Sequence, residues 1–252
     1  MTTKKLEQKI FRANCELPPD VKTVLLKAAQ TENNVRGEEF LKLIKENISV
    51  AKKESHPLCQ DTGTVSFHVH AGVDMKSLRE AAGRAYSCLR NSQVKRPFDR
   101  EVDKRNLPSI NFAPDNFAPS FIIRGGGAMN CSGLIMANPS ANENALALEI
   151  ADFVISKAPH CCPPVFVGVG IGGTPSDALL AGERMLIKDV RKPMSDMEKK
   201  IYGKINRSGI GPGGWGGKNT ALCVRISELP AHMATMPVGI VMSCWCLRKG
   251  KI

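Results

Sequence analysis

The chain has 252 residues, of which 42% are hydrophobic, and a formal net charge of +11. This size and composition are enough to bury a core in one large domain or two small ones, and no apolar run has the length that spans a bilayer. The first residues lack the apolar core of a secretion signal, so we expect a cytoplasmic globular protein with no membrane contact. The positive charge favours acidic partners, but only 5% of residues are aromatic and no nucleic-acid-binding module is recognisable, so we expect no nucleic acid partner.

The nine cysteines favour reduced thiols over disulfides, because the chain carries no recognisable secretion signal. None is spaced as in zinc ribbons or ferredoxins: Cys161 and Cys162 are adjacent, and Cys244 and Cys246 are one residue apart. Any metal cluster must therefore be assembled from distant loops. Cys59 lies in such a loop, among hydrogen-bonding side chains, which is unusual for a merely buried thiol.

Residues 1–54 are predicted to be helical and to serve as packing elements. Pro18, Pro19 and Asp20 are typical of a helix start, and apolar residues follow at spacings of three and four. A second helix is expected from about Glu38, and Pro57 prevents its easy continuation.

A half-buried strand is predicted after the polar loop that contains Cys59. Val65, Phe67 and Val69 alternate with polar residues, so one face of the strand is buried. We expect His68 and His70 to lie on the other face, at the surface.

The next region combines a helix, a long loop and a glycine-rich turn. Residues 74–93 read as a helix, and residues 95–119 are rich in Pro, Asn and Asp and are expected to form a long loop that covers a functional site. A short strand, 121–123, then runs into Arg124 and three successive glycines. A cation beside three glycines suits a backbone that closes on an anionic ligand, and a flexible turn is the alternative.

A strand, a turn and a helix are predicted in the second half of the chain. Val165–Ile171 has a glycine at every second position from Gly168, which predicts a buried strand that another group approaches closely. Thr174, Pro175 and Asp177 are typical of a helix start, where exposed backbone N–H groups can bind an anion.

A cofactor site is only one interpretation of this segment. Gly168, Gly170 and Gly173 also satisfy the GxGxxG pattern of dinucleotide-binding turns. The acidic residue that should end a second strand is missing, because Asp189 lies in a charged stretch with no apolar strand before it. A nucleotide-binding domain and a purely structural turn stay open as alternatives.

Residues 211–218, GPGGWGGK, resemble a phosphate-binding loop only superficially. The spacing is one residue off, and Asn219 stands where a hydroxyl residue is needed. Three elements flank this loop in the sequence: a helix over 142–157, a helix with a capping box of Ser195 and Glu198, and a strand over 237–242 that ends at Cys244.

Several motifs occur in an order that resembles one enzyme family. In chain order they are HPLCQDTGT, RGGGAMN, CCPPVFVGVGIGGTPSDALLAGERML, GPGGWGGKNTAL and HMATMPVGIVMSC, between about His56 and Cys244. The chain resembles the α-type catalytic part of the iron-sulfur hydro-lyases, the class I fumarases and L-tartrate dehydratases. This resemblance implies an α/β fold, a mixed sheet with flanking helices, in a single domain over 1–252 with residues 1–54 as its helical N-terminal part.

The resemblance implies a 4Fe-4S cluster that is held by three cysteines, Cys59, Cys162 and Cys244. One iron then has no protein ligand and acts as a Lewis acid. The implied reaction is the reversible hydration or dehydration of a small dicarboxylate, either fumarate and malate or tartrate and oxaloacetate.

The resemblance also assigns roles to other residues. Gln60, Arg90 and Gly127 match substrate-binding positions, and Asp61 and His232 match positions that handle protons near the catalytic centre. In the family, the general base and further arginines come from a β-type domain that is not recognisable in this sequence. We therefore expect a β-type subunit as partner, in a heterotetramer, and no activity of the chain alone. The alternative is a non-catalytic iron-sulfur binding subunit or a diverged paralogue.

Two stretches depart from the family pattern. Arg124–Asn130 reads RGGGAMN where the family usually has a lysine and a GGGSEN sequence, and Lys104–Pro119 reads KRNLPSINFAPDNFAP in place of the usual RKNTGDNTPA pattern. These departures leave the substrate open between fumarate, tartrate and related dicarboxylates. Cys161 and Cys246 lie near the implied ligands in the sequence, and neither they nor Cys131 have an assigned role.

Overall fold

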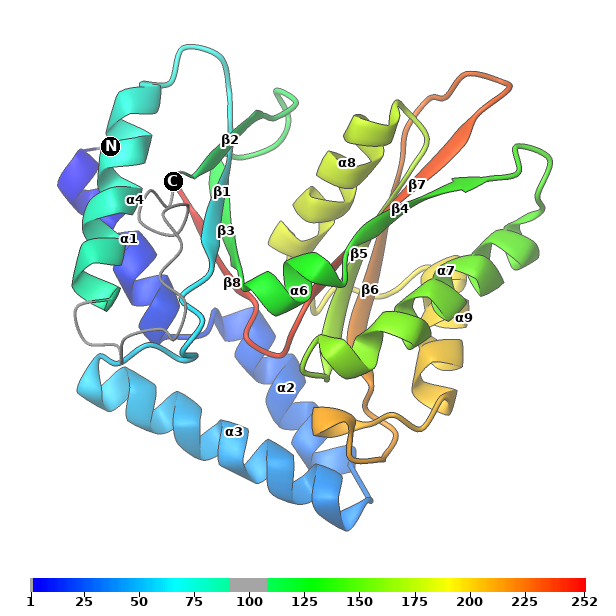
Figure 1. Cartoon of the computed structure of the whole chain (residues 1–252), viewed down its shortest axis with the longest axis horizontal. Helices are drawn as coiled ribbons and strands as arrows, with labels where there is room; N and C mark the ends of the chain where they lie inside the picture. The colour runs from blue at the N-terminus through cyan, green and yellow to red at the C-terminus, as the bar shows by residue number, and fades with distance from the viewer. Residues whose placement is uncertain (1, 91–107) are drawn as a thin grey trace. The chain divides into compact units, whose positions relative to one another are not determined.

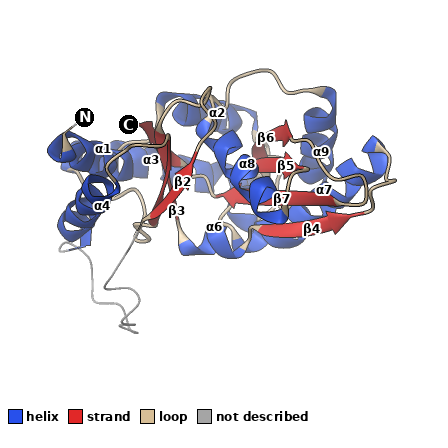
Figure 2. Ribbon diagram, turned by 90° about the horizontal axis from the view of Figure 1, so that it is seen from above, coloured by secondary structure: helices blue, strands red, loops and turns tan. Residues whose placement is uncertain are grey.

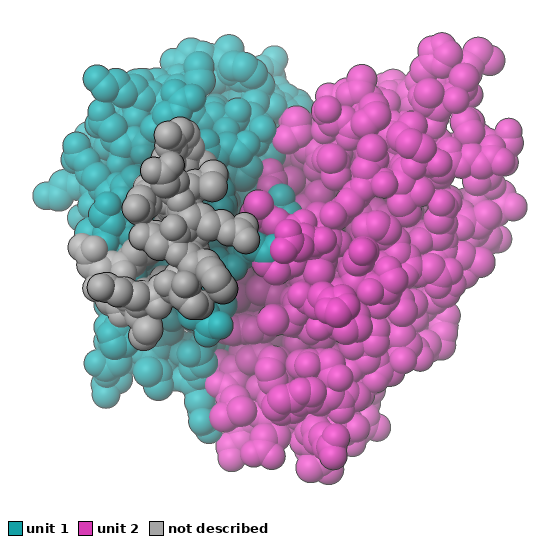
Figure 3. Space-filling model, in the orientation of Figure 1, with its two compact units in different colours: residues 1–18, 46–126, 248–252 teal, residues 19–45, 127–247 magenta. Residues whose placement is uncertain are grey.

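The chain forms two compact units (Figure 3), and each unit has its own β-sheet. The computed structural model describes residues 2–90 and 108–252. Unit 1 comprises residues 1–18, 46–126 and 248–252, and unit 2 comprises residues 19–45 and 127–247. The predicted mixed α/β class is confirmed, with two mixed sheets in place of one, whereas the single domain over 1–252 stays a prediction. Within the described residues, no helix is both long and apolar enough to cross a bilayer.

Helices and strands follow one another along the described residues (Figure 1). The helices are α1 (Thr3–Cys15), α2 (Pro19–Thr31), α3 (Val35–Glu54), α4 (Met75–Arg90), α6 (Gly126–Asn130), α7 (Glu143–Lys157), α8 (Pro175–Ile187) and α9 (Asp196–Arg207). The strands are β1 (Thr64–Val69), β2 (Ser109–Phe112), β3 (Ser120–Arg124), β4 (Gly133–Ala137), β5 (Val165–Ile171), β6 (Ala221–Glu228), β7 (Met236–Ser243) and β8 (Arg248–Lys251). The predicted helices and strands are confirmed with shifts of a few residues at their ends, except that residues 91–93 of the helix predicted over 74–93 lie outside the described residues.

The sheet of unit 1 has the strand order β2-β1-β3-β8. Strand β1 runs parallel to β2 and antiparallel to β3. Helices α1 and α4 cover one face of this sheet, and Val65, Phe67 and Val69 of β1 are buried against them. The predicted alternation of β1 is therefore confirmed.

The expectation that both histidines of β1 lie at the surface is wrong for His68. His68 is fully buried, and its ring lies 6.1 Å from the ring of Phe117. His70 is half-buried, with its Nε2 2.8 Å from the backbone oxygen of Phe117. An alternating strand shows which face is apolar, but it does not show whether the polar face is also covered by a distant segment.

The expected long loop over 95–119 contains a strand, so this prediction is wrong for part of its length. Strand β2 occupies Ser109–Phe112 and pairs with β1 at the edge of the sheet. Ser109–Phe112 alternates polar and apolar residues, but it is a short run between Pro108 and Pro114, and prolines so close to it favour a loop. The first part of the predicted loop, 95–107, lies outside the described residues.

The sheet of unit 2 has the strand order β4-β7-β5-β6, and helices cover both of its faces (Figure 2). Val165, Val167 and Val169 of β5 pack in one core with residues of α7 and α9. Because side chains alternate along a strand, Gly168 and Gly170 lie on the opposite face, towards α8.

The glycines of β5 allow α8 to lie directly against the sheet. A Cβ atom at Gly168 would overlap the backbone oxygen of Gly182, and one at Gly170 would overlap that of Ala178. The predicted close approach is thus confirmed, and the group that approaches is the backbone of a helix. Helix packing explains two of the three GxGxxG glycines without a nucleotide.

We predict that Gly170→Ala lowers the free energy of unfolding by about 3 kcal/mol or more, because the added methyl group forces α8 off the sheet. The matched control is Gly203→Ala in α9, where a Cβ meets only the end of the Arg207 side chain, at 3.2 Å. Removing a helical glycine there should stabilise the fold by about 0.5–1 kcal/mol. Urea unfolding measures both values, and equal effects would contradict the packing role of Gly170.

Candidate functional site

The residues that the sequence singles out are distributed over both units. Those in unit 1 are Cys59, Gln60, Asp61 and Arg90, and those in unit 2 are Gly127, Cys162, His232 and Cys244. Arg90 is the last residue of α4, and its side chain lies outside the described part of the structure.

The CQDTG loop, residues 59–63, joins α3 to β1 and is fixed at its start by two asparagines. The N–H of Leu58 donates to the backbone oxygen of Asn14 at 2.8 Å, and the Asn47 side chain donates to the backbone oxygen of Leu58 at 2.8 Å. The Cys59 side chain is half-buried and Gln60 is exposed. The loop therefore holds its backbone against unit 1 while these two side chains reach the unit's surface.

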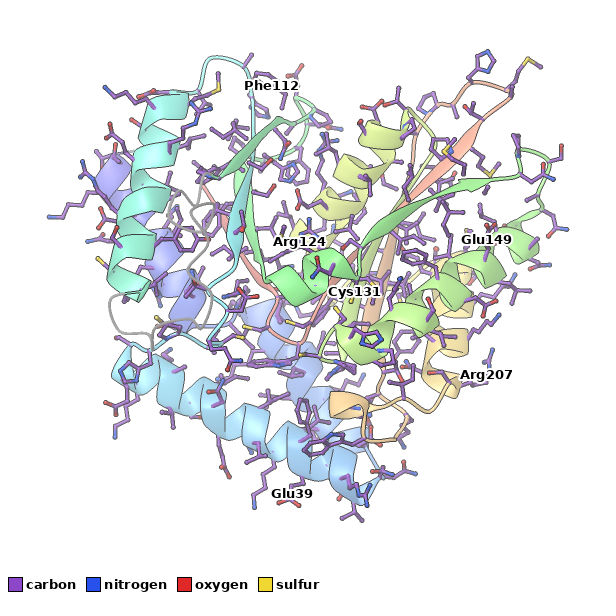
Figure 4. The ribbon with its side chains drawn as sticks, in the orientation of Figure 1. Glu39, Phe112, Arg124, Cys131, Glu149 and Arg207 are labelled. Atoms are coloured by element: carbon purple, nitrogen blue, oxygen red, sulfur yellow. The ribbon has the colours of Figure 1, made fainter. Side chains whose placement is uncertain are left out.

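Asp61 is the anion on which the glycine turn closes. Its Oδ1 accepts from the N–H of Gly63 at 2.9 Å, and its Oδ2 accepts from the N–H of Gly126 at 2.7 Å. A Cβ atom at Gly125, next to Arg124 (labelled in Figure 4), would lie 2.7 Å from Oδ2. The anion expected at these glycines is thus supplied by the protein itself, and two hydrogen bonds fix the orientation of the carboxylate.

Cys162 and Cys244 lie at the same end of the two central strands of the sheet of unit 2. Cys162 comes shortly before β5 and Cys244 directly follows β7, and Phe166 of β5 pairs with Ser243 of the antiparallel β7. The start of β5 therefore lies beside the end of β7. The structure thus places two of the three implied cluster ligands on one side of unit 2.

Cys162 also has an unusual backbone conformation. It is exposed, and its φ of 50° lies in the left-handed region. This conformation costs a residue with a Cβ roughly 1–2 kcal/mol, and such strain is often retained at functional positions. The strain favours a functional role for this thiol.

Cys161 lies in a group of thiols within unit 2. Burial raises the pKa of its thiol, and the neighbouring Cys244, Cys131 and Cys162 raise it further. Cys131, labelled in Figure 4, is also buried and is hydrogen-bonded to Cys161. Because a metal binds the thiolate, the exposed Cys162 is better placed as a ligand than its buried neighbour.

The ligand set as a whole stays a prediction. Cys59 belongs to unit 1, whereas Cys162 and Cys244 belong to unit 2. Over residues 2–90 and 108–252, no three His, Cys, Asp or Glu side chains form a group that is ready to hold a metal ion.

His232 is not brought close to Cys162 and Cys244 within unit 2. It is exposed in the loop between β6 and β7, before the start of β7, so the full length of β7 separates it from Cys244. Eight residues of strand span about 26 Å. Its Nδ1 accepts from the N–H of Ala234 at 3.2 Å. Its role in proton transfer therefore stays a prediction that the geometry of unit 2 does not support.

Gly127 lies in α6 with open space beside it. It is exposed, and a Cβ atom there would meet only the backbone oxygen of His160, at 3.7 Å. The backbone at this position is accessible to a ligand, as its implied substrate contact requires.

The glycine-rich loop, residues 211–219, binds the carboxylate of Glu32. Its buried carboxylate accepts from the backbone N–H groups of Lys218 and Asn219 and from the Asn219 side chain. Burial raises its pKa, but hydrogen bonds from Asn219, Asn33, Asn34 and Lys218 outweigh this and lower the pKa overall. A bound carboxylate thus replaces the phosphate that such a loop otherwise suggests. No sequence pattern indicates this contact, because Glu32 lies 186 residues before Lys218.

This loop in turn supports the segment that carries Cys162. The N–H of Gly213 donates to the backbone oxygen of Pro163 at 2.8 Å. Glu32 therefore holds a loop that contacts the residue directly after Cys162.

The start of α8 has its own carboxylate as well. Asp177 Oδ2 accepts from the backbone N–H and the hydroxyl of Thr174, at 3.0 and 2.7 Å, and these hydrogen bonds lower the pKa of Asp177. The predicted capping arrangement is confirmed.

Comparison with known proteins identifies the family. The family described as fumarate hydratase (fumerase) matches residues 3–252. This chain belongs to that family. It is 32% identical, over 95% of its length and 93% of the relative, to a Methanocaldococcus jannaschii protein with the provisional name L(+)-tartrate dehydratase subunit alpha.

Two further relatives support the same assignment. The L(+)-tartrate dehydratase subunit alpha of Escherichia coli K12 is 25% identical over 94% of the chain and 85% of the relative. A Geobacillus stearothermophilus protein, provisionally named class I fumarate hydratase, is 26% identical over 96% of the chain but only 52% of the relative. The chain therefore belongs to the α-type subunits of the fumarate hydratase and tartrate dehydratase hydro-lyases.

We predict that Glu32→Gln lowers the free energy of unfolding by about 2–3 kcal/mol at pH 7, because an amide accepts the same hydrogen bonds more weakly and places a donor against donors. The folded-state pKa of Glu32 lies below its unfolded value, so its contribution is present above about pH 4.3 and is lost as the pH falls through the folded-state pKa. The difference between the two proteins should therefore shrink in acid.

Urea unfolding at several pH values measures this difference. The exposed Glu39 of α3, in the same unit, provides the matched control. Glu39→Gln should change the free energy of unfolding by less than about 0.5 kcal/mol. A Glu32→Gln effect of that small size would show that the carboxylate does not hold the loop.

Proposed function

We propose that this chain is the cluster-binding subunit of an iron-sulfur hydro-lyase that reversibly adds water to a small dicarboxylate, either fumarate or oxaloacetate in its enol form. A β-type subunit is the partner, in a heterotetramer. Two relatives that the chain matches over 93% and 85% of their lengths are named as alpha subunits, which supports a partner chain.

The observation that carries this proposal is the arrangement of the CQDTG loop. Its backbone is hydrogen-bonded to unit 1, Asp61 is held by two N–H groups, and the Cys59 and Gln60 side chains reach the surface. A soft ligand, an amide and an oriented carboxylate in three successive residues suit a metal-assisted reaction on a polar substrate.

Cys59, Cys162 and Cys244 are the residues that would hold the cluster. Thiols are the ligands that iron-sulfur clusters prefer, and the exposed, strained Cys162 beside Cys244 fits this donor set. When bound, a cluster with one iron free of protein ligands supplies a Lewis acid for the departing hydroxyl group.

Asp61 is proposed to transfer a proton, and Gln60, Arg90 and Gly127 to bind the substrate. A carboxylate that is fixed by two hydrogen bonds needs no reorientation before it reacts. The net charge of +11 attracts dicarboxylates to the protein. A role of His232 in proton transfer is proposed only because its position matches the family's motif.

The first test is Cys162→Ser in the enzyme assembled anaerobically with its β-type partner. We expect the hydration of fumarate or the dehydration of tartrate to be lost, because an oxygen ligand replaces a thiolate, and iron content and absorption to fall with it. Cys88→Ser, at an exposed cysteine of α4, should leave both unchanged. Full activity of Cys162→Ser would reject the cluster mechanism.

The second test separates proton transfer from cluster binding. Asp61→Asn should lower kcat by about 10²- to 10⁴-fold, as expected when a general acid or base is removed, with the iron content unchanged. Asp74→Asn is the matched control, because the Asp74 carboxylate also accepts a backbone N–H, from Lys76, at the exposed start of α4. Equal kcat values for the two variants would exclude Asp61 from the reaction.

A further inference from the structure

Arg248 is a guanidinium group that is buried inside unit 1. It begins strand β8, opposite Ile123 of β3, and only 1% of it is exposed. Moving a cation out of water costs free energy unless its N–H groups find acceptors. The acceptors of Arg248 therefore show which part of the chain it stabilises.

The CQDTG loop provides one of these acceptors. Arg248 Nη1 donates to the backbone oxygen of Asp61 at 3.0 Å and to the Asn14 side-chain oxygen at 2.8 Å. The loop also runs against the guanidinium at Gly63, where a Cβ atom would lie 2.9 Å from Nη2. The backbone of the loop is thus packed directly on a buried cation.

Asn14 connects Arg248 to the other end of the same segment. Its side chain receives the Arg248 hydrogen bond, and its backbone oxygen receives the N–H of Leu58. Asn14 is itself fully buried. Residues 58 and 61 are therefore attached to one buried pair, with Cys59 and Gln60 between them.

We propose that Arg248 is a positioning residue for the hydro-lyase reaction, an inference that rests on the function proposed above. With 1% exposure it cannot contact the substrate. It acts through the peptide of Asp61, from which the carboxylate projects. Without this hydrogen bond the Asp61 backbone moves, and its carboxylate no longer meets the N–H groups of Gly63 and Gly126 in the same geometry.

The test compares three variants of the assembled enzyme. Arg248→Met retains an apolar chain of similar length and removes every donor. Arg248→Lys retains a cation that is able to donate to both acceptors. Lys249→Met is the matched control, because it removes another buried cation from β8 on the opposite face of the strand.

The first readout is amide hydrogen exchange at Gly63 and Gly126, which reports the position of Asp61 without any turnover. Arg248→Met should raise exchange at both amides by about tenfold or more, Arg248→Lys should lie between it and the wild type, and Lys249→Met should not differ from the wild type. Amides of α4 in unit 1 serve as the reference for unfolding of that unit.

The second readout is steady-state kinetics. Arg248→Met should lower kcat by about 10- to 100-fold, the effect of a misplaced catalytic group, with KM changed by less than about threefold because Arg248 does not touch the substrate. Arg248→Lys should restore part of kcat.

The outcomes distinguish this inference from the proposed function. Wild-type exchange at Gly63 and Gly126 in Arg248→Met would overturn the positioning role, and so would faster exchange with an unchanged kcat. A wild-type enzyme that turns over no dicarboxylate would overturn the proposed function, while faster exchange in Arg248→Met would still support the attachment of the loop to Arg248.

Discussion

The described structure depends on carboxylates that accept hydrogen bonds from backbone N–H groups in or beside glycine-rich turns. Asp61 is bound at the turn that begins α6, Glu32 at the loop over 211–219, and Asp177 at the start of α8. Such turns attract anions of any origin, because their N–H groups point to one place. In all three the anion belongs to the chain, so turns that resemble ligand-binding loops instead fix the positions of neighbouring segments.

Two of these carboxylates act on the candidate site, Asp61 directly and Glu32 through the loop that it holds. Asp61 accepts the hydrogen bonds that close the glycine turn, and it is also the residue proposed to transfer a proton. A substitution of Asp61 therefore affects both the local structure and the proposed reaction. Glu32 acts at one remove, because the loop that it holds donates a hydrogen bond to Pro163, next to Cys162. A conventional activity assay alone does not separate these roles, which makes stability and amide exchange the informative measurements.

The sequence predicted what is decided locally. Helix starts at Pro19 and Asp196, the strand around Phe67 and the close approach at Gly168 follow from capping residues, alternation and missing side chains. It did not predict the burial of His68, the partner of Asn219 or the contacts of Arg248, because these depend on residues far away in the chain. The cluster ligands came only from the order of the motifs, since no local spacing marks three cysteines in separate loops.

The glycines of β5 influence the candidate site without reaching it. Because Gly168 and Gly170 let α8 pack backbone to backbone on the sheet, β5 has little freedom to shift along or away from its neighbours. Cys162 lies in the loop before β5 and Cys244 directly follows its antiparallel neighbour β7, so the pairing of Phe166 with Ser243 keeps the two segments that carry these thiols side by side. A metal cluster tolerates little change in ligand spacing, and a rigid sheet beneath both loops limits how far two of the three cysteines proposed as ligands can move apart.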